Sequence, residues 1–163
     1  MPIPIYVKIV LWTAYLLSLF FAIFWFLVLL DKETKTKTKR LKKFSIVSIV
    51  IPAYDEEKNI LTTLASLTKL NYPKDKLELI VVNDGSTDNT KNIVKEFIAR
   101  NKAFDIKLIN KKNEGKGSAL NIGLAISKGE FFICLDADSI VTRDSLEKIL
   151  PHFTNDNIAV VLP

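Results

Sequence analysis

An uncharged apolar segment close to the amino terminus restricts the fold of this chain more than any other feature. The segment covers residues 9–30 and reads IVLWTAYLLSLFFAIFWFLVLL. A helix of that length spans roughly 33 Å, which is enough to cross the hydrocarbon core of a bilayer. A cleavable signal peptide is the alternative, but its apolar stretch is usually about 7 to 15 residues and a small-residue cleavage site follows it. We therefore expect an uncleaved transmembrane anchor over residues 1–30.

The positive charge of the chain gathers in a short linker after this anchor. The formal net charge is +5, and residues 31–43 hold seven Lys or Arg side chains against two acidic ones. Lys8 is the only charged side chain before the apolar segment. The positive-inside rule therefore predicts a single-pass protein of the cell membrane with its C-terminal domain in the cytoplasm. The linker is either a contact for anionic lipid headgroups or a solvated spacer.

Residues 44–163 have the composition of a separate globular domain. They hold 15 basic and 16 acidic side chains, and this near-neutral balance argues against a nucleic-acid partner. The single cysteine, Cys134, excludes a disulfide framework and a Cys-rich metal site. Because Cys134 lies within an apolar run, we expect it to be a buried core residue.

Short β-rich runs alternate with longer stretches of helical spacing throughout this domain. We expect strands over residues 46–51, 77–82, 106–109, 131–135 and 158–162. Apolar residues at spacings of three and four predict helices within 60–67, 93–98 and 119–126. Alternation of helices with nearly continuous apolar strands predicts an α/β fold with a mostly parallel, Rossmann-like sheet.

Polar residues follow three of the expected strands. They are PAYDEE at 52–57, NDGSTD at 83–88 and DAD at 136–138. Ligands of an open parallel sheet bind outside the carboxyl ends of its strands, so we expect these residues to share one acidic rim. For the first two loops, helix capping by Asp55 and Thr87 explains the residues as well as ligand binding does.

Asp136 and Asp138 carry the strongest indication of chemistry. If the strand continues past them, both carboxylates project from one face, an arrangement that is costly without a cation between them. Paired carboxylate oxygens suit Mg²⁺ or Mn²⁺, and such ions commonly bridge to substrate phosphates. The alternative is a solvated acidic turn.

A glycine-rich segment, NEGKGS at residues 113–118, precedes one of the expected helices. Backbone N–H groups, the positive end of the helix and the Lys116 ammonium could all face an anion there. The segment lacks the spacing of a Walker A loop, and the chain has no GxGxxG fingerprint. Lys116 is therefore either a phosphate contact or a surface lysine on a flexible turn.

Three segments, taken together, resemble the nucleotide-sugar-binding half of family 2 glycosyltransferases with the GT-A fold. They read VSIVIPAYDEEKNI, LELIVVNDGSTDNT and NEGKGSALNIGLAISKGEFFICLDADS. The resemblance runs from about residue 44 to the end of the chain. With the preceding apolar helix, this arrangement is similar to processive polysaccharide synthases. The resemblance implies a UDP-linked nucleotide-sugar donor, a divalent cation and a polysaccharide or polyprenyl-phosphate acceptor.

The same resemblance implies a role for each matching position. The residues implied in donor binding are Pro52, Ala53, Tyr54, Glu57, Asp84, Lys116 and Asp136. Tyr54 matches the position beside the base, and Asp84 matches the residue that contacts the uracil or the ribose. Asp136 matches a position near the ribose and the metal, while Asp138 matches the ligand of the Mg²⁺ or Mn²⁺ on the diphosphate.

The catalytic base of the family has no match in this chain. In the family it is usually an Asp in a Glu-Asp pair downstream of the paired aspartates, and processive members add Gln-x-x-Arg-Trp. Asp144, Glu147 and Asp156 lack that sequence context, and we give the only histidine, His152, no catalytic role. The catalytic residue stays unassigned, and we expect a truncated gene product or a split enzyme that a second chain completes.

Two other functions remain open at this point. One is a noncatalytic, membrane-tethered module that binds a nucleotide sugar or takes part in assembly. The other is a polyprenyl-phosphate sugar synthase, which would share the donor motifs and use a lipid acceptor.

Overall fold

The computed structural model describes residues 4–30 and 44–154. The chain divides into an N-terminal unit and an α/β domain, and each is described by itself. The expected linker at residues 31–43 and the expected strand at 158–162 lie outside the described residues.

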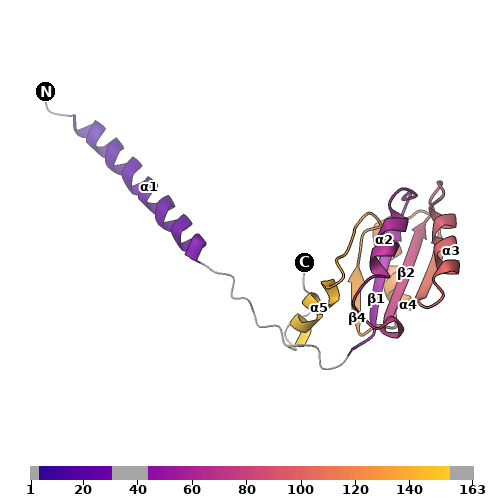
Figure 1. Cartoon of the computed structure of the whole chain (residues 1–163). Coiled ribbons are helices and arrows are strands. Elements are labelled where there is room, and N and C mark those ends of the chain that lie inside the picture. The colour runs from indigo at the N-terminus through magenta and orange to yellow at the C-terminus, as the bar shows by residue number, and fades with distance from the viewer. Residues whose placement is uncertain (1–3, 31–43, 155–163) are drawn as a thin grey trace. The chain divides into compact units, whose positions relative to one another are not determined.

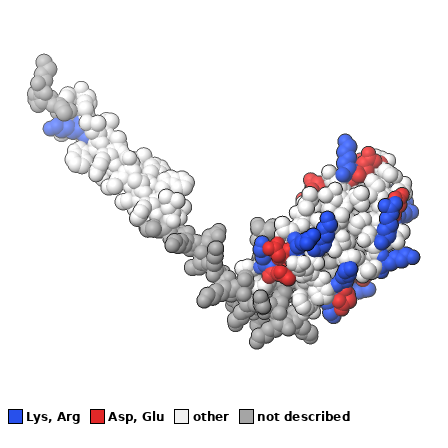
Figure 2. Space-filling view, in the orientation of Figure 1, with Lys and Arg blue, Asp and Glu red and all other residues white. Residues whose placement is uncertain are grey.

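The N-terminal unit consists of one helix, α1 (Ile5–Leu30). Its segment Ile5–Leu29 is long and apolar enough to cross a membrane, and its most apolar stretch is not buried against other described residues. The helix surface is uncharged apart from one basic side chain near the amino end (Figure 2). Apolar side chains on every side of a helix suit a lipid environment better than water. The expected long apolar helix is therefore present.

The α/β domain is built on a four-stranded sheet (Figure 1). Its strands are β1 (Val47–Ala53), β2 (Leu77–Asp84), β3 (Asp105–Lys111) and β4 (Phe131–Cys134). Their spatial order is β3-β2-β1-β4, and all three strand pairs are parallel. The prediction of an α/β fold with a parallel sheet is confirmed.

Helices cover both faces of the sheet (Figure 1). α2 (Ile60–Leu67) and α3 (Thr90–Arg100) pack on one face, whereas α4 (Lys116–Ile126) packs on β1 and β2 from the other. The other described elements are α5 (Ser145–Ile149) and the 3₁₀ helices η1 (Lys74–Lys76) and η2 (Leu150–Thr154). Parallel strands require crossover connections, and this is why helices alternate with strands along the chain.

The sheet separates the core into two apolar layers. On one side, Ile49 packs with Leu64 of α2, and on the other, Val50 and Ile80 pack with Ala119 of α4. Successive strand residues point to opposite faces, so a strand that is covered on both sides needs apolar residues at nearly every position. Burying one such side chain contributes about 1.5–3 kcal/mol. The two central strands therefore form a rigid support for the loops at their ends.

A buried carboxylate ties the connection that enters β4 to the central strands. Glu78 of β2 is 2% exposed and accepts hydrogen bonds from Ser48 and Lys107. The N–H of Lys128 also donates to Glu78, at 2.9 Å, and the N–H of Gly129 donates to the Ser48 hydroxyl, at 2.8 Å. Burial acts to raise the pKa of Glu78, but the hydrogen bonds outweigh it and hold this pKa below its usual value. This network fixes the chain just before β4 begins.

The expectation of a buried Cys134 is wrong, because its side chain is exposed. Cys134 lies on the same face of β4 as Phe132, which is 39% exposed. On that face α4 covers β1 and β2 and leaves β4 open. The apolar run identified the strand, but not its position at the edge of the described sheet.

Candidate functional site

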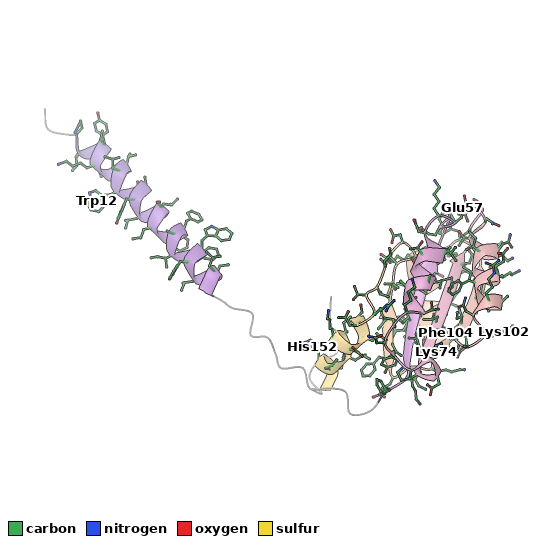
Figure 3. The ribbon with its side chains drawn as sticks, viewed as in Figure 1. Trp12, Glu57, Lys74, Lys102, Phe104 and His152 are labelled. Carbon is green, nitrogen blue, oxygen red and sulfur yellow. The ribbon has the colours of Figure 1, made fainter. Side chains whose placement is uncertain are left out.

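The carboxyl ends of β1 and β4 border the point where the strand order reverses. From β1 the chain proceeds outward through β2 to β3 and then crosses back to β4 on the other side of β1. Open α/β sheets bind their ligands at such a reversal. In Figure 3, Glu57 marks the carboxyl ends of the strands, and Lys74 and Phe104 mark the opposite ends.

The loops that follow β1 and β2 are joined by hydrogen bonds. The carboxylate of Asp55 accepts the N–H of Thr87 at 2.7 Å. The N–H of Glu57 donates to Asp88 at 2.9 Å, and the Glu57 carboxylate accepts the N–H of Asn89 at 3.0 Å. The two acidic strand ends therefore share one rim, as the sequence predicts.

Asp55 and Thr87 do not cap helices, so the capping alternative is wrong for both. The N-cap residue of α2 is Asn59, and that of α3 is Asn89. Asp55 has a φ of 52°, and its carboxylate reaches the neighbouring loop instead of its own helix. The physical reason is that β1 and β2 are adjacent and parallel, which brings their two end loops within hydrogen-bonding distance.

Three of the predicted donor contacts lie at the end of β1 and directly after it. Pro52 and Ala53 are the last two residues of the strand, and Ala53 is buried. Tyr54 follows them and is 48% exposed. Of the three, Tyr54 therefore presents the largest side-chain surface to a ligand.

Asp84 ends β2 and is almost completely buried, with 3% exposure. Its carboxylate lies 2.5 Å from the Lys111 ammonium and accepts the N–H groups of Glu114 at 3.1 Å and Gly115 at 2.8 Å. Burial acts to raise the pKa of Asp84, but these hydrogen bonds outweigh it and lower the pKa below its usual value. Asp84 thus holds the glycine-rich segment against the end of the sheet.

Two glycines allow this close approach. Gly85 has a φ of 75°, and a Cβ added there would lie 2.7 Å from the backbone nitrogen of Asn113. Gly115 has a φ of 91° and is the N-cap residue of α4, which consequently begins without a capping side chain. The first N–H groups of the helix and the positive end of its dipole can therefore face an anion.

Lys116 links the start of α4 to the segment after β4. Its Nζ lies 2.6 Å from Oδ1 of Asp136, although the two residues are 20 positions apart. The side chains are 58% and 52% exposed, respectively, so the pair is accessible to a ligand. The hydrogen bond to Asp136 raises the pKa of Lys116. Lys116 is therefore a cation at neutral pH.

The chain turns directly after β4 and does not continue as a strand. β4 ends at Cys134, and the N–H of Ser139 donates to the carbonyl of Asp136 at 3.1 Å. Ala137 is buried within this turn, and its carbonyl accepts the hydroxyl of Thr63 at 2.7 Å. The expectation that strand alternation aligns the two carboxylates is therefore wrong. Both aspartates are exposed because they flank a buried alanine in a turn.

Asp136 and Asp138 fit a divalent cation that a substrate helps to hold. Within residues 4–30 and 44–154, no three His, Cys, Asp or Glu side chains come together in a metal-binding arrangement. The two exposed carboxylates offer hard oxygen ligands, and Mg²⁺ usually completes such a site with water and substrate phosphates. The donor set therefore suits a shared cation better than a closed protein cage.

Two supporting residues, Lys111 and Thr63, were not singled out from the sequence. Lys111 is the register partner of Asp84 across β2 and β3. Alignment of the carboxyl ends of the two expected strands would have indicated this pair. Thr63 reaches Ala137 across 74 positions, and no local pattern indicates that contact.

The strand order and the architecture place the protein in the GT-A-like class of α/β domains. The chain belongs to glycosyl transferase family 2, whose sequence profile matches residues 48–163. The probable glycosyltransferase YdaM of Bacillus subtilis is 39% identical over 123 residues, which are 74% of this chain and 29% of that protein. A poly-beta-1,6-N-acetyl-D-glucosamine synthase of Staphylococcus epidermidis is 38% identical over 61% of this chain and 23% of that protein. The chain thus spans less than a third of the length of these relatives.

Solved structures support the same assignment. The mannosyltransferase PcManGT from Pyrobaculum calidifontis, solved with GDP-Man and Mn²⁺, is 27% identical with a TM-score of 0.73 over 90% of this chain and 42% of that one. TarS of S. aureus, solved with UDP-GlcNAc, is 34% identical with a TM-score of 0.58 over 63% of this chain and 29% of that one. The expected family and the expected GT-A-like fold are both confirmed.

Proposed function

We propose that this chain is the donor-binding part of a membrane-anchored glycosyltransferase. It would transfer a sugar from a nucleotide-sugar donor, UDP-linked, to a polysaccharide or lipid acceptor with the help of Mg²⁺ or Mn²⁺. The observation that carries the proposal is the meeting of Lys116 with Asp136 at 2.6 Å, with Asp138 in the same turn. The ammonium and the uncapped start of α4 suit the diphosphate, and the two carboxylates suit the metal ion bound to it. All of them lie where the strand order reverses, which is where open parallel sheets bind their ligands.

The proposed roles follow from the match of each position to the family, and the exposure of Tyr54 supports them. Tyr54, the exposed residue after β1, contacts the base, while Pro52 and Ala53 form the backbone beside it. Glu57 fixes the loop that carries Tyr54 through its exchange with the loop after β2. Asp84 matches the position beside the base and ribose, and because it is buried its proposed role there is to hold the glycine-rich segment in place.

The remaining residues act on the diphosphate. Lys116 donates a charge-assisted hydrogen bond to a phosphate oxygen, and Asp136 and Asp138 hold the divalent cation. When bound, this cation neutralises the negative charge that develops on the departing nucleoside diphosphate. The paired positive charges therefore favour cleavage of the bond between the sugar and the diphosphate.

An apolar groove beside β4 suits the acceptor half of the enzyme. The groove has a volume of about 950 Å³, and its lining includes Ile133, Leu135, Val141, Leu146 and Leu150. Within the described residues, the outer edge of β4 has no neighbouring strand. The matched curated relatives contain much additional sequence. We place the part of the enzyme that supplies the acceptor site and the general base against this groove.

The proposed location is the cell membrane, with one span and a cytoplasmic catalytic domain. The support is the apolar helix α1 and the excess of Lys and Arg in residues 31–43. The domain then works on donors that are available on the cytoplasmic side.

Ligand-dependent stabilisation of the purified full chain in detergent tests donor binding. At about 100 times its Kd, a ligand of the native state adds about 2.7 kcal/mol, which raises the Tm of a domain of this size by roughly 11 °C. We expect this rise with UDP and Mn²⁺ together, and its loss in Asp138→Asn. Asp75→Asn is the matched control, because Asp75 is exposed and lies in η1, before β2 begins. GDP with Mn²⁺ is run in parallel to identify the base.

The absence of any rise with either nucleotide at millimolar concentration would contradict the proposed donor site. Transfer is measured separately with radiolabelled donor, first with this chain alone and then together with the product of the adjacent coding sequence. Donor binding without transfer in both cases would favour the noncatalytic module, and a labelled polyprenyl-phosphate product would identify the lipid acceptor.

A further inference from the structure

Asp136, a predicted ligand of the divalent cation, is already paired with a cation of the protein itself. The Lys116 ammonium lies 2.6 Å from its Oδ1. An ammonium at hydrogen-bonding distance and a divalent cation on the same carboxylate repel each other, even where solvent screens the charges. In this arrangement Oδ1 of Asp136 is occupied, so Lys116 must move away before both carboxylate oxygens can coordinate a cation.

We propose that Lys116 is a stand-in for the divalent cation, and that the diphosphate of the donor draws it away from Asp136 so that the metal can bind. This inference rests on the proposed function, since it concerns the same site. It adds a coupling between the binding events: cation and nucleotide bind well together, and neither binds well alone.

The exposure of the pair makes such an exchange inexpensive. The Lys116 and Asp136 side chains are 58% and 52% exposed, and solvent-exposed ion pairs contribute little to stability. A diphosphate oxygen offers Lys116 a charge-assisted hydrogen bond equivalent to the one it leaves. The exchange replaces one anionic partner by another, and the released carboxylate becomes a metal ligand.

The position of Lys116 on α4 also favours the exchange. Lys116 is the first residue of the helix, and its neighbours Gly117 and Ser118 continue the uncapped amino end. A phosphate bound to these N–H groups lies within reach of the Lys116 side chain without movement of the backbone. The backbone itself is fixed, because Asp84 holds Gly115 at 2.8 Å.

Positive coupling between cation and nucleotide follows from this exchange. In the absence of nucleotide, Mn²⁺ must break the Lys116–Asp136 pair and tolerate a nearby ammonium. In its presence, Lys116 has already moved to the phosphate, and the phosphate supplies further ligands. By linkage, each ligand increases the affinity of the other by the same factor.

Two affinities that move in opposite directions test the proposal. The full chain in detergent is titrated with Mn²⁺ alone, and free Mn²⁺ is followed by electron paramagnetic resonance. UDP binding at saturating Mn²⁺ is measured by calorimetry. We expect Lys116→Ala to bind Mn²⁺ alone about three- to ten-fold more tightly than the wild type. The same variant should bind UDP with Mn²⁺ about ten-fold or more weakly, because the phosphate loses a charged donor.

Lys112→Ala is the matched control. Lys112 is exposed on the same loop, and its replacement removes one positive charge while the Lys116–Asp136 pair stays intact. We expect both affinities of this variant to stay within about two-fold of the wild type, as for a solvent-screened surface charge. A general loss of structure in Lys116→Ala would weaken both affinities, which separates that effect from the proposed exchange.

The possible results distinguish this inference from the proposed function. If the wild type binds UDP with Mn²⁺ but Lys116→Ala binds Mn²⁺ alone no more tightly, the stand-in role is wrong and the donor site remains. If the wild type does not bind UDP with Mn²⁺ at millimolar concentration, the donor site itself is wrong. The titration with Mn²⁺ alone still tests whether Lys116 competes with the metal.

Discussion

Replacement of Gly85 by alanine tests whether the loops after β2 and β3 must touch for this site to form. An added Cβ would lie 2.7 Å from the backbone nitrogen of Asn113, and the φ of Gly85 is 75°. A left-handed backbone costs about 1–2 kcal/mol for a residue with a Cβ, and overpacking a tight contact costs about 1–3 kcal/mol. We expect the free energy of unfolding to fall by about 2–5 kcal/mol, which lowers the Tm by roughly 8–20 °C.

Two other glycines of the same region separate the causes. Gly115 has a φ of 91° with nothing within 4 Å of an added Cβ, so Gly115→Ala should cost only the backbone part, about 1–2 kcal/mol. Gly117 lies in α4 with open space around an added Cβ and no positive φ, and its replacement should be neutral or stabilising by up to about 1 kcal/mol. Equal losses for Gly85→Ala and Gly115→Ala would refute the close contact as a constraint.

Differential scanning calorimetry of the full chain in detergent is the suitable assay. Both tryptophans, Trp12 and Trp25, lie in α1, so tryptophan fluorescence would not report unfolding of the α/β domain. Isothermal titration with UDP and Mn²⁺ completes the experiment, because a displaced Asn113 loop also shifts the start of α4. Lower nucleotide affinity of Gly85→Ala at a temperature where it is folded is the expected second result.

Two further predictions concern the buried carboxylate and the exposed thiol. Glu78→Gln should lower the free energy of unfolding by about 2–3 kcal/mol at neutral pH, because it leaves Lys107 without its counter-ion. The folded-state pKa of Glu78 lies below its usual value near 4.5, so its stabilisation is present above that value and is lost as the pH falls through the folded-state pKa. The variant should show a weaker acid dependence in calorimetric scans between neutral pH and about pH 3, and an unchanged dependence would contradict this role. Cys134 should react with a maleimide in the folded protein, since it is exposed. Although the side chain is exposed, partial desolvation by its neighbours raises the pKa of Cys134, so the labelling rate should rise with pH through a pKa above that of a free thiol. Labelling only after unfolding would contradict its placement.

The fold was predictable because its strands are covered on both sides. Central strands such as β1 and β2 need apolar residues on both faces, and this produces continuous runs that a sequence shows directly. The same rule failed at Cys134. β4 is equally apolar in sequence, but α4 does not cover the face of β4 that carries Phe132 and Cys134. An apolar run records that a segment is a strand, whereas its coverage depends on where distant helices pack.

The candidate site was predictable where it depends on topology and unpredictable where it depends on side-chain contacts. Parallel strands bring the residues after β1, β2 and β4 to one edge, and this follows from the strand–helix alternation alone. The partner of Asp55 is in the next loop and not in its own helix, and local capping rules cannot distinguish the two. The turn at Asp136 depends on Ala137, which is buried against α2 through Thr63. Long-range packing of this kind leaves no periodic signal.

Two Lys–Asp pairs on one short segment explain how the site combines rigidity with exchange. The Lys111 and Asp84 side chains are 9% and 4% exposed, whereas those of Lys116 and Asp136 are 58% and 52% exposed. Removing a partner from a buried pair leaves an uncompensated charge in a poorly solvated place, but an exposed charge is solvated as soon as its partner leaves. A diphosphate can therefore recruit Lys116 and cannot recruit Lys111, although five positions separate the two lysines. The buried pair holds the start of α4 in place while the exposed pair opens, so the ligand reorganises one side chain and not the loop.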